Sequence, residues 1–267
     1  MDEVVIEETD GIGSVRLNRP GRGNSVTPEV VTALGDAVRR LCEKESVRAV
    51  VLTGTGSVFC AGADVREMHD VYRNDGADAL MDYLADVWMP AVQRTVRGLW
   101  AAPKPLVAAF NGAATAGGLD FGLACDVRIA ADTARFAESY VNLGMVPVAG
   151  GAFLLPMVTG LPAATYLLAS GSFADASQAL DLGIVSEVCA ADELVVRARK
   201  VAAELAHGPA ETFARTKRIA RASSTQALEA ALRDSLDANV ELIARPEVRE
   251  RILSVMDRFA LTGSRSG

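Results

Sequence analysis

Residues 104–139, KPLVAAFNGAATAGGLDFGLACDVRIAADTARFAES, contain the pattern that decides the fold. An apolar run at 106–112 predicts a strand that ends in a turn of small residues. A helix is expected from Gly118 to Cys125, and a second β-rich run follows at 127–131. A strand, a glycine-rich loop, a helix and another strand therefore follow one another within a short stretch.

The same alternation extends toward the N-terminus. A hairpin is predicted within the first thirty residues, and Thr27 before a proline predicts a helix from Pro28 to about Glu45. A strand is expected at 48–54, with helical stretches at 64–72 and around 77–99. The order of these elements indicates an α/β fold.

The C-terminal part of the chain has a different character. Beyond Asp192 the sequence is alanine-rich, helical in pattern and heavily charged. We predict a core domain at 1–204 and a helical C-terminal subdomain at 205–267. No low-complexity linker divides them, so they are expected to pack together. The uncharged stretch from Ser139 to Ala174 is interrupted by prolines and glycines, which favours interior loops and core helix over a membrane span.

Composition excludes several classes of protein. Half of the 267 residues are apolar, which is enough for a sizeable core, and the net charge is −7. Such a chain has no global positive field for nucleic acid or an anionic membrane, so an anionic ligand must be held by local groups. Four scattered cysteines and two histidines argue against a metal site and favour reduced thiols in the cytoplasm. The acidic N-terminus does not resemble a targeting signal.

Two glycine-rich turns carry the functional signal. The first is FCAGAD at 59–64 and the second is NGAATAGGLD at 111–120, each between a predicted strand and a helix start. Backbone N–H groups at such helix starts lack acceptors and can bind an oxyanion. The alternative is that both turns are glycine-rich only because two backbones approach closely there.

Several longer strings resemble the crotonase, or enoyl-CoA hydratase/isomerase, superfamily. They are NRP at 18–20, VLTGTGSVFCAGADVREM at 51–68, the stretch at 104–139, NLGMVPVAGG at 142–151 and DLGIVSEV at 181–188. The resemblance implies a spiral of repeated ββα units and a C-terminal α-helical subdomain that forms a homotrimer, often a dimer of trimers. It also implies an acyl-CoA thioester as the substrate, with no metal and no permanently bound cofactor.

The resemblance also assigns roles to individual residues. Ala63 and Gly117 match the two positions whose N–H groups hold the thioester carbonyl in that family. Asp120 and Tyr140 stand where hydratases have two glutamates that hold and activate water. Glu138, two residues before Tyr140, is expected on the same side of an extended segment and could supply a substitute carboxylate. Its alternative is an acid at the surface or in a structural ion pair.

Predicted CoA-binding residues lie around the first turn. Arg66 matches a position near the adenine and 3′-phosphate of CoA, and Arg22 is a second cation of this kind. Ala61 and Asp64 complete the set, although Asp64 is expected chiefly to cap the next helix. Large apolar side chains near this turn are predicted to line an acyl pocket or to form helix core: Met68, Leu80, Met81, Leu84, Trp88 and Met89.

The leading hypothesis is a cytoplasmic acyl-CoA enzyme that stabilises a thioester enolate, with Asp120 transferring the proton and Tyr140 orienting the substrate. The reaction is hydration or double-bond isomerisation of an enoyl-CoA. One alternative is an acyl-CoA-binding protein without hydratase activity. Another is hydrolysis or decarboxylation of an acyl-CoA on the same fold.

Overall fold

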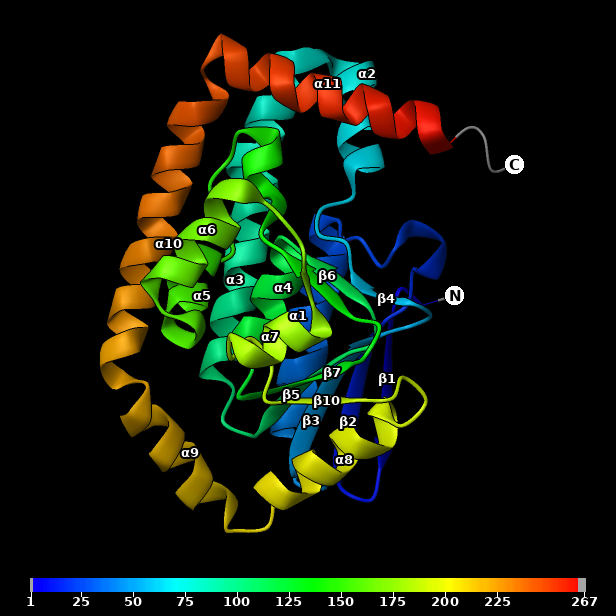
Figure 1. The fold of residues 1–267 in the computed structure, drawn as a ribbon, viewed down its shortest axis with the longest axis vertical. Coiled ribbons are helices and arrows are strands. Elements are labelled where there is room, and N and C mark those ends of the chain that lie inside the picture. Colours follow the sequence, from blue (N-terminus) through cyan, green and yellow to red (C-terminus); the bar gives the residue numbers. More distant parts are fainter. Residues whose placement is uncertain (1, 264–267) are drawn as a thin grey trace.

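The computed structural model describes the backbone of residues 2–263 and the side chains of residues 2–258. A six-stranded sheet has the order β1-β2-β3-β5-β7-β10, and a smaller sheet has the order β4-β6-β8-β9 (Figure 1). The strands are β1 Val4–Thr9, β2 Ile12–Leu17, β3 Ala49–Gly54, β4 Val58–Cys60, β5 Leu106–Phe110, β6 Ala113–Thr115, β7 Val127–Ala131, β8 Arg135–Ala137, β9 Ala174–Asp175 and β10 Glu187–Cys189.

In each repeat, the first strand belongs to the larger sheet and the second strand to the smaller sheet. β3, β5 and β7 lie side by side and parallel in the larger sheet, while the strand after each of them, β4, β6 and β8, joins the smaller sheet in the same order. Each repeat is thus displaced sideways from the one before it, which generates a spiral. The predicted crotonase-like α/β architecture is confirmed, as is the N-terminal hairpin, whose two strands pair antiparallel.

Helices cover the sheets and form the C-terminal part of the chain. The α-helices are α1 Pro28–Glu43, α2 Val65–Tyr83, α3 Met89–Ala101, α4 Gly117–Leu123, α5 Gly151–Thr159, α6 Leu161–Ser170, α7 Ala176–Asp181, α8 Leu194–Leu205, α9 Ala210–Ala220, α10 Ala222–Ile243 and α11 Pro246–Gly263. Short turns of other helix types are η1 Pro20–Arg22, η2 Leu84–Trp88 and η3 Ser139–Leu143.

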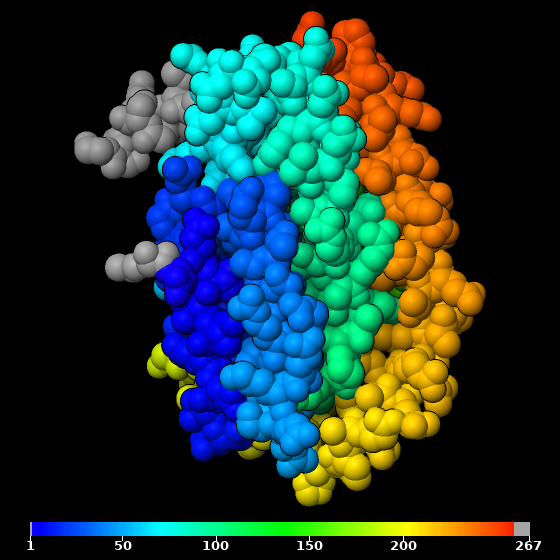
Figure 2. Space-filling view, turned by 180° about the vertical axis from the view of Figure 1, so that it is seen from behind, coloured from blue at the N-terminus to red at the C-terminus, as the bar shows by residue number. Residues whose placement is uncertain are grey.

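The central strands β3 and β5 of the larger sheet are buried on both faces. Val50 and Leu52 of β3 belong to the main apolar core, which also contains the inner faces of α1 and α3. Their neighbours Ala49 and Val51 point to the opposite face and pack in a second cluster with α8. Seen from behind, α1 and α3 lie next to each other and the C-terminal helices form the neighbouring edge of the molecule (Figure 2). Burial on both faces explains why the sequences of β3 and β5 are almost wholly apolar.

Local signals define the start of α1. The Thr27 hydroxyl oxygen accepts a hydrogen bond from the Val30 N–H at 3.3 Å, and Pro28 occupies the first helical position. The predicted helix is confirmed, ending at Glu43. By contrast, the two helical stretches expected at 64–72 and 77–99 are joined, because α2 continues through Gly76 with a break at φ 92° and leads through η2 into α3.

The C-terminal helices pack on the body of the molecule. α10 runs along α5, and α11 crosses over α2 (Figure 1). The domain division at residue 205 stays a prediction. The expectation of core helix within 139–174 is wrong for α6, where Leu161 and Tyr166 are 69% and 66% exposed. Its apolar residues surround the whole helix, and only the face with Ala164 and Leu167 is buried. Within the described residues, no helix has the length and apolarity needed to cross a bilayer.

Candidate active site

The turn after β4 sets the direction of the Ala63 N–H. The Val26 N–H donates to the Gly62 carbonyl at 2.8 Å, and the Asp64 N–H donates to the Val26 carbonyl at 3.0 Å. Because backbone groups alternate in direction along an extended segment, the N–H of Ala63, between these two residues, points away from Val26. Ala63 also lines a cavity.

The turn after β6 contains a strained residue. Ala116 has φ 49° and ψ −126°, a conformation that alanine adopts only when its surroundings impose it. Its N–H donates to the Ala137 carbonyl at 2.8 Å, which fixes this geometry. Gly117 follows as the first residue of α4, so its N–H has no acceptor within the helix.

The two turns are in direct contact. A Cβ atom placed on Gly62, which has φ +85°, would lie 3.1 Å from the Thr115 carbonyl oxygen and 3.9 Å from the Gly117 nitrogen. A Cβ on Gly118 would lie 2.3 Å from the carbonyl oxygen of Cys60. Glycine is therefore needed for the backbones to approach, and this approach brings together the predicted donor residues Ala63 and Gly117. The close-approach explanation is confirmed for these glycines, and the oxyanion role stays a prediction.

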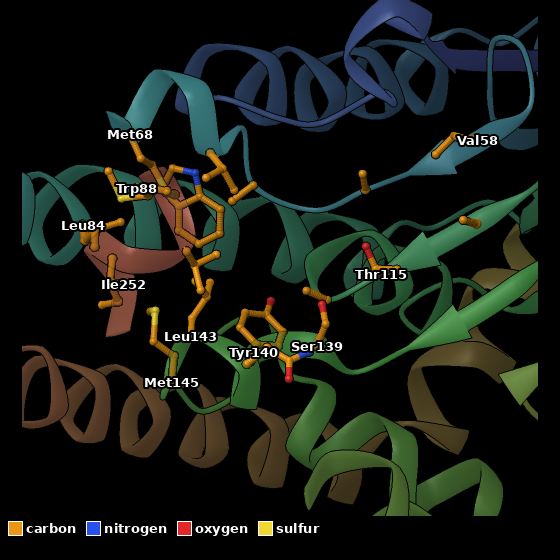
Figure 3. A pocket seen from close by; sticks show the side chains of 18 of the residues that line it. Val58, Met68, Leu84, Trp88, Thr115, Ser139, Tyr140, Leu143, Met145 and Ile252 are labelled. Carbon is orange, nitrogen blue, oxygen red and sulfur yellow. The ribbon is translucent and has the colours of Figure 1, made fainter. Parts of the chain in front are cut away.

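A cavity of about 470 Å³ opens beside these turns (Figure 3). Of the six apolar residues predicted for an acyl pocket, Met68, Leu84 and Trp88 line it, and the other three are buried in the core: Leu80, Met81 and Met89. Sequence reasoning missed the wall supplied by α11, which consists of Ile252, Val255 and Met256. It also missed the polar lining residues Thr115, Ser139 and Asn142. The apolar spacing along α11 is visible in the sequence, but it does not say which surface that helix covers.

Asp120 lies behind this cavity. It projects from α4, is 0% exposed, and does not line the cavity. The Tyr140 hydroxyl donates a hydrogen bond to Asp120 Oδ2 at 3.0 Å. Burial raises the pKa of Asp120 to about 7, and the hydrogen bond from Tyr140 acts in the opposite direction. The carboxyl group therefore gains or loses a proton near neutral pH.

Tyr140 and Glu138 both turn toward Asp120. Tyr140 belongs to η3 and lies between Ser139 and Leu143 on the cavity wall (Figure 3). Glu138 is only 1% exposed, so the alternative of a surface acid is wrong. Burial, with the nearby charge of Asp120, raises the pKa of Glu138 well above its usual value. Burial likewise raises the pKa of Tyr140, which keeps it a neutral phenol at physiological pH.

The predicted CoA-binding residues lie around Asp64. Its Oδ1 accepts a hydrogen bond from the Arg66 N–H at 3.1 Å, so the expected cap of α2 is confirmed. Its carboxylate also pairs with Arg19 at 2.8 Å and with Arg22 at 3.6 Å. Arg66 and Ala61 are exposed, and Ala61 also lines the cavity. Asp64 is buried and already paired, so it positions Arg22 rather than offering a free carboxylate to a ligand. Among the described residues, no group of three or more metal-binding side chains comes together.

Comparisons with known proteins agree with this geometry. The family model described as Enoyl-CoA hydratase/isomerase matches residues 7–260. A probable enoyl-CoA hydratase of Mycobacterium bovis is 32% identical over 235 residues, which cover 88% of this chain and 86% of the relative. A 4-chlorobenzoyl coenzyme A dehalogenase of an Arthrobacter species is 29% identical over 250 residues, covering 93% and 88%.

Solved structures show the same similarity. An enoyl-CoA hydratase from Mycobacterium avium subsp. paratuberculosis superimposes with a TM-score of 0.81 at 30% identity, covering 96% of each chain. An enoyl-CoA hydratase from Bacillus halodurans gives 0.84 at 25% identity, covering 95% of this chain and 100% of the other. With the fold, the turns and these matches in agreement, the chain belongs to the enoyl-CoA hydratase/isomerase family of the crotonase superfamily.

Proposed function

We propose that this protein binds an acyl-CoA thioester, with the carbonyl oxygen held by the N–H groups of Ala63 and Gly117. The observation that carries the proposal is the contact between the two turns beside the apolar cavity. An acyl chain fits a cavity of this size and apolar character. The exposed Arg66 and Arg22 are suited to the phosphates of CoA.

The chemistry proposed is proton transfer at a carbon conjugated with the thioester. Removing such a proton moves negative charge onto the carbonyl oxygen, where preorganised N–H donors contribute about 10²- to 10³-fold each. The proton is exchanged with the hydrogen-bonded pair of Tyr140 and Asp120. General acid–base assistance of this kind is worth about 10²- to 10⁴-fold.

Double-bond isomerisation of a 3-enoyl-CoA is the reaction favoured, with hydration of a 2-enoyl-CoA as the second candidate. Among the described residues that line the cavity, none has a carboxylate side chain. Hydration needs a water molecule that is held and deprotonated, whereas isomerisation needs only one proton to leave one carbon and return to another. The family membership supports both reactions.

The test is an assay of the purified protein with 3-enoyl-CoA and with 2-enoyl-CoA. Asp120→Asn is expected to lower turnover by about 10²- to 10⁴-fold. The matched control is Asp132→Asn, which changes an exposed carboxylate directly after β7 and is expected to keep full activity. Unchanged turnover in Asp120→Asn would remove Asp120 from the mechanism.

The same assay separates the alternatives. Release of free CoA would indicate hydrolysis, and evolution of carbon dioxide would indicate decarboxylation. Saturable binding of an acyl-CoA in calorimetry, without conversion of any thioester, would indicate a binding protein.

A homotrimer or a dimer of trimers is proposed as the functional assembly. α9 makes few contacts with its own chain, and Ile219 on this helix is 71% exposed. Leu161 and Tyr166 on α6 are exposed in a similar way. Exposed apolar residues on two helices are typical of a surface that a second subunit covers. A single monomeric species in sedimentation velocity would contradict this assembly.

The cytoplasm is proposed as the location. All four cysteines are unpaired, and burial raises the pKa of the Cys60 and Cys125 thiols to about 12. Such thiols are unreactive and suit a reducing compartment. Cell fractionation tests this location.

A further inference from the structure

We infer that the Tyr140 hydroxyl is the group that exchanges a proton with the acyl substrate, and that a carboxyl pair formed by Asp120 and Glu138 is the proton store behind it. This inference rests on the proposed function, since it assigns the proton path within the same site. Tyr140 would then be a catalytic residue. Asp120 and Glu138 would act through it.

The position of Tyr140 between the cavity and Asp120 is the first support. Tyr140 lines the cavity, and its hydroxyl lies 3.4 Å from the Cβ position of Gly117, next to a predicted carbonyl donor. On its other side the same hydroxyl donates to Asp120 Oδ2 at 3.0 Å. Asp120 is fully buried, and the Tyr140 hydroxyl provides a direct hydrogen-bonded route between the cavity and this carboxyl group.

The Tyr140 oxygen is oriented so that it can accept a proton from the cavity side. Its proton points to Asp120, since the hydroxyl donates to Asp120 Oδ2. A phenol oxygen also has acceptor lone pairs, which can take a proton from the cavity side. A proton arriving from a substrate carbon can bind there while the original proton moves to Asp120.

The carboxyl pair is the second support. A Cβ atom on Gly151 would lie 2.2 Å from Asp120 Oδ1 and 2.6 Å from Glu138 Oε1, so both carboxyl groups meet over this glycine. In the described part of the chain, no N–H or hydroxyl group donates to these two oxygens or to Glu138 Oε2. Two buried carboxylates that meet without a donor between them would repel each other, so the pair is expected to share one proton and carry one negative charge.

The surroundings offer the pair no other charge. The elements packed against α4 are α3, α5, β4, β5 and β6. Four of these have no charged residue; on α3, Arg94 is exposed and Arg97 pairs with Glu229. The thiols of Cys60, which faces α4, and of Cys125, which donates to the Phe121 carbonyl, stay neutral because burial raises the pKa of each to about 12. The negative charge is therefore confined to the two carboxyl groups.

The proton transfer balances without another reactant. The C–H bond next to the thioester carbonyl breaks, its proton binds the Tyr140 oxygen, and its electron pair becomes the enolate. At the same time the Tyr140 O–H bond breaks and that proton moves to Asp120 Oδ2. Tyr140 is neutral before and after, and the negative charge moves from the carboxyl pair to the oxygen held at Ala63 and Gly117. The reverse transfer to a different carbon completes an isomerisation.

Tyr140→Phe is the first test, with 3-butenoyl-CoA in deuterium oxide as the reactive probe and butanoyl-CoA as the binding probe. The variant is expected to lose about 10²- to 10⁴-fold in isomerisation and in deuterium uptake, while its calorimetric affinity for butanoyl-CoA is unchanged. A Tyr140→Phe protein with the wild-type rate would overturn the relay and leave the proposed function intact. A wild-type protein that neither binds nor converts these thioesters would overturn the proposed function itself.

Glu138 has a readout of its own in the pH profile. Glu138 meets Asp120 over Gly151 and lowers the pKa of Asp120, so Glu138→Leu is expected to move the midpoint of the pH–rate profile upward. Glu138→Gln keeps an N–H donor and is expected to retain the wild-type midpoint. A purely structural role would lower the rate of Glu138→Leu without moving its midpoint, and that result would contradict the carboxyl pair.

Discussion

Gly151→Ala tests whether the position of the carboxyl pair controls the chemistry. The added Cβ atom would lie 2.2 Å from Asp120 Oδ1, 2.6 Å from Glu138 Oε1 and 3.0 Å from Glu138 Cδ. Since non-bonded carbon atoms pack about 3.5–4.0 Å apart, the two carboxyl groups must retreat by roughly 1 Å. Gly151 lies at the start of α5, where the backbone leaves little room for the methyl group itself to withdraw.

Activity and stability should respond differently to this change. A displacement of about 1 Å in catalytic geometry costs on the order of 10²-fold in rate, so turnover of 3-enoyl-CoA should fall by that factor. Overpacking costs about 1–3 kcal/mol, and replacing a helical glycine with alanine offsets up to about 1 kcal/mol of it. The protein should therefore remain folded, with a net loss of about 0–2 kcal/mol in its free energy of unfolding.

The matched control is Gly98→Ala in α3, where a Cβ atom would meet nothing within 4 Å. This variant is expected to keep full activity and to be as stable as the wild type or more so. Initial rates and urea unfolding of both variants provide the measurement. A Gly151→Ala protein with wild-type turnover would show that the carboxyl groups can move by this distance without consequence, and would refute the assignment of Asp120 and Glu138.

Three further predictions follow from the described contacts. Burial raises the pKa of Asp120 from 3.8 to about 7, so the folded state keeps a proton that the unfolded chain releases. The contribution of Asp120 to the free energy of unfolding should therefore fall as pH rises from about 4 to about 7 and then level off. In urea titrations across that range, Asp120→Asn should flatten this slope. Asp64→Ala removes a helix cap and leaves Arg19 without its buried partner, so a loss of about 2–4 kcal/mol is expected in urea unfolding, whereas Asp64→Asn, which can still cap α2, should lose less. Leu143→Trp adds bulk to a half-buried cavity wall, so kcat/KM should fall about tenfold or more for long acyl chains and little for short ones; equal losses for all chain lengths would contradict an acyl site there.

The parts of the structure that the sequence predicted are those with local causes. The Thr27–Pro28 start of α1 depends on neighbouring residues, and the strand expected at 127–131 coincides with β7 because a short β-rich run is enough to specify it. The two glycine turns were also predicted, since each requires close backbone approach. The arrangement of Asp120 and Glu138 over Gly151 depends on three elements that meet only in the folded chain. Residue spacing alone does not indicate that Asp120 is buried behind Tyr140.

The wall that α11 contributes to the cavity couples ligand binding to the end of the chain. Ile252, Val255 and Met256 come from a helix whose main contacts are with α2. A bound acyl chain would touch both helices, so ligand binding would stabilise the packing of α11 on α2. Amide hydrogen exchange in residues 246–258 should accordingly slow in proportion to acyl-CoA occupancy, which makes this helix a built-in reporter of saturation.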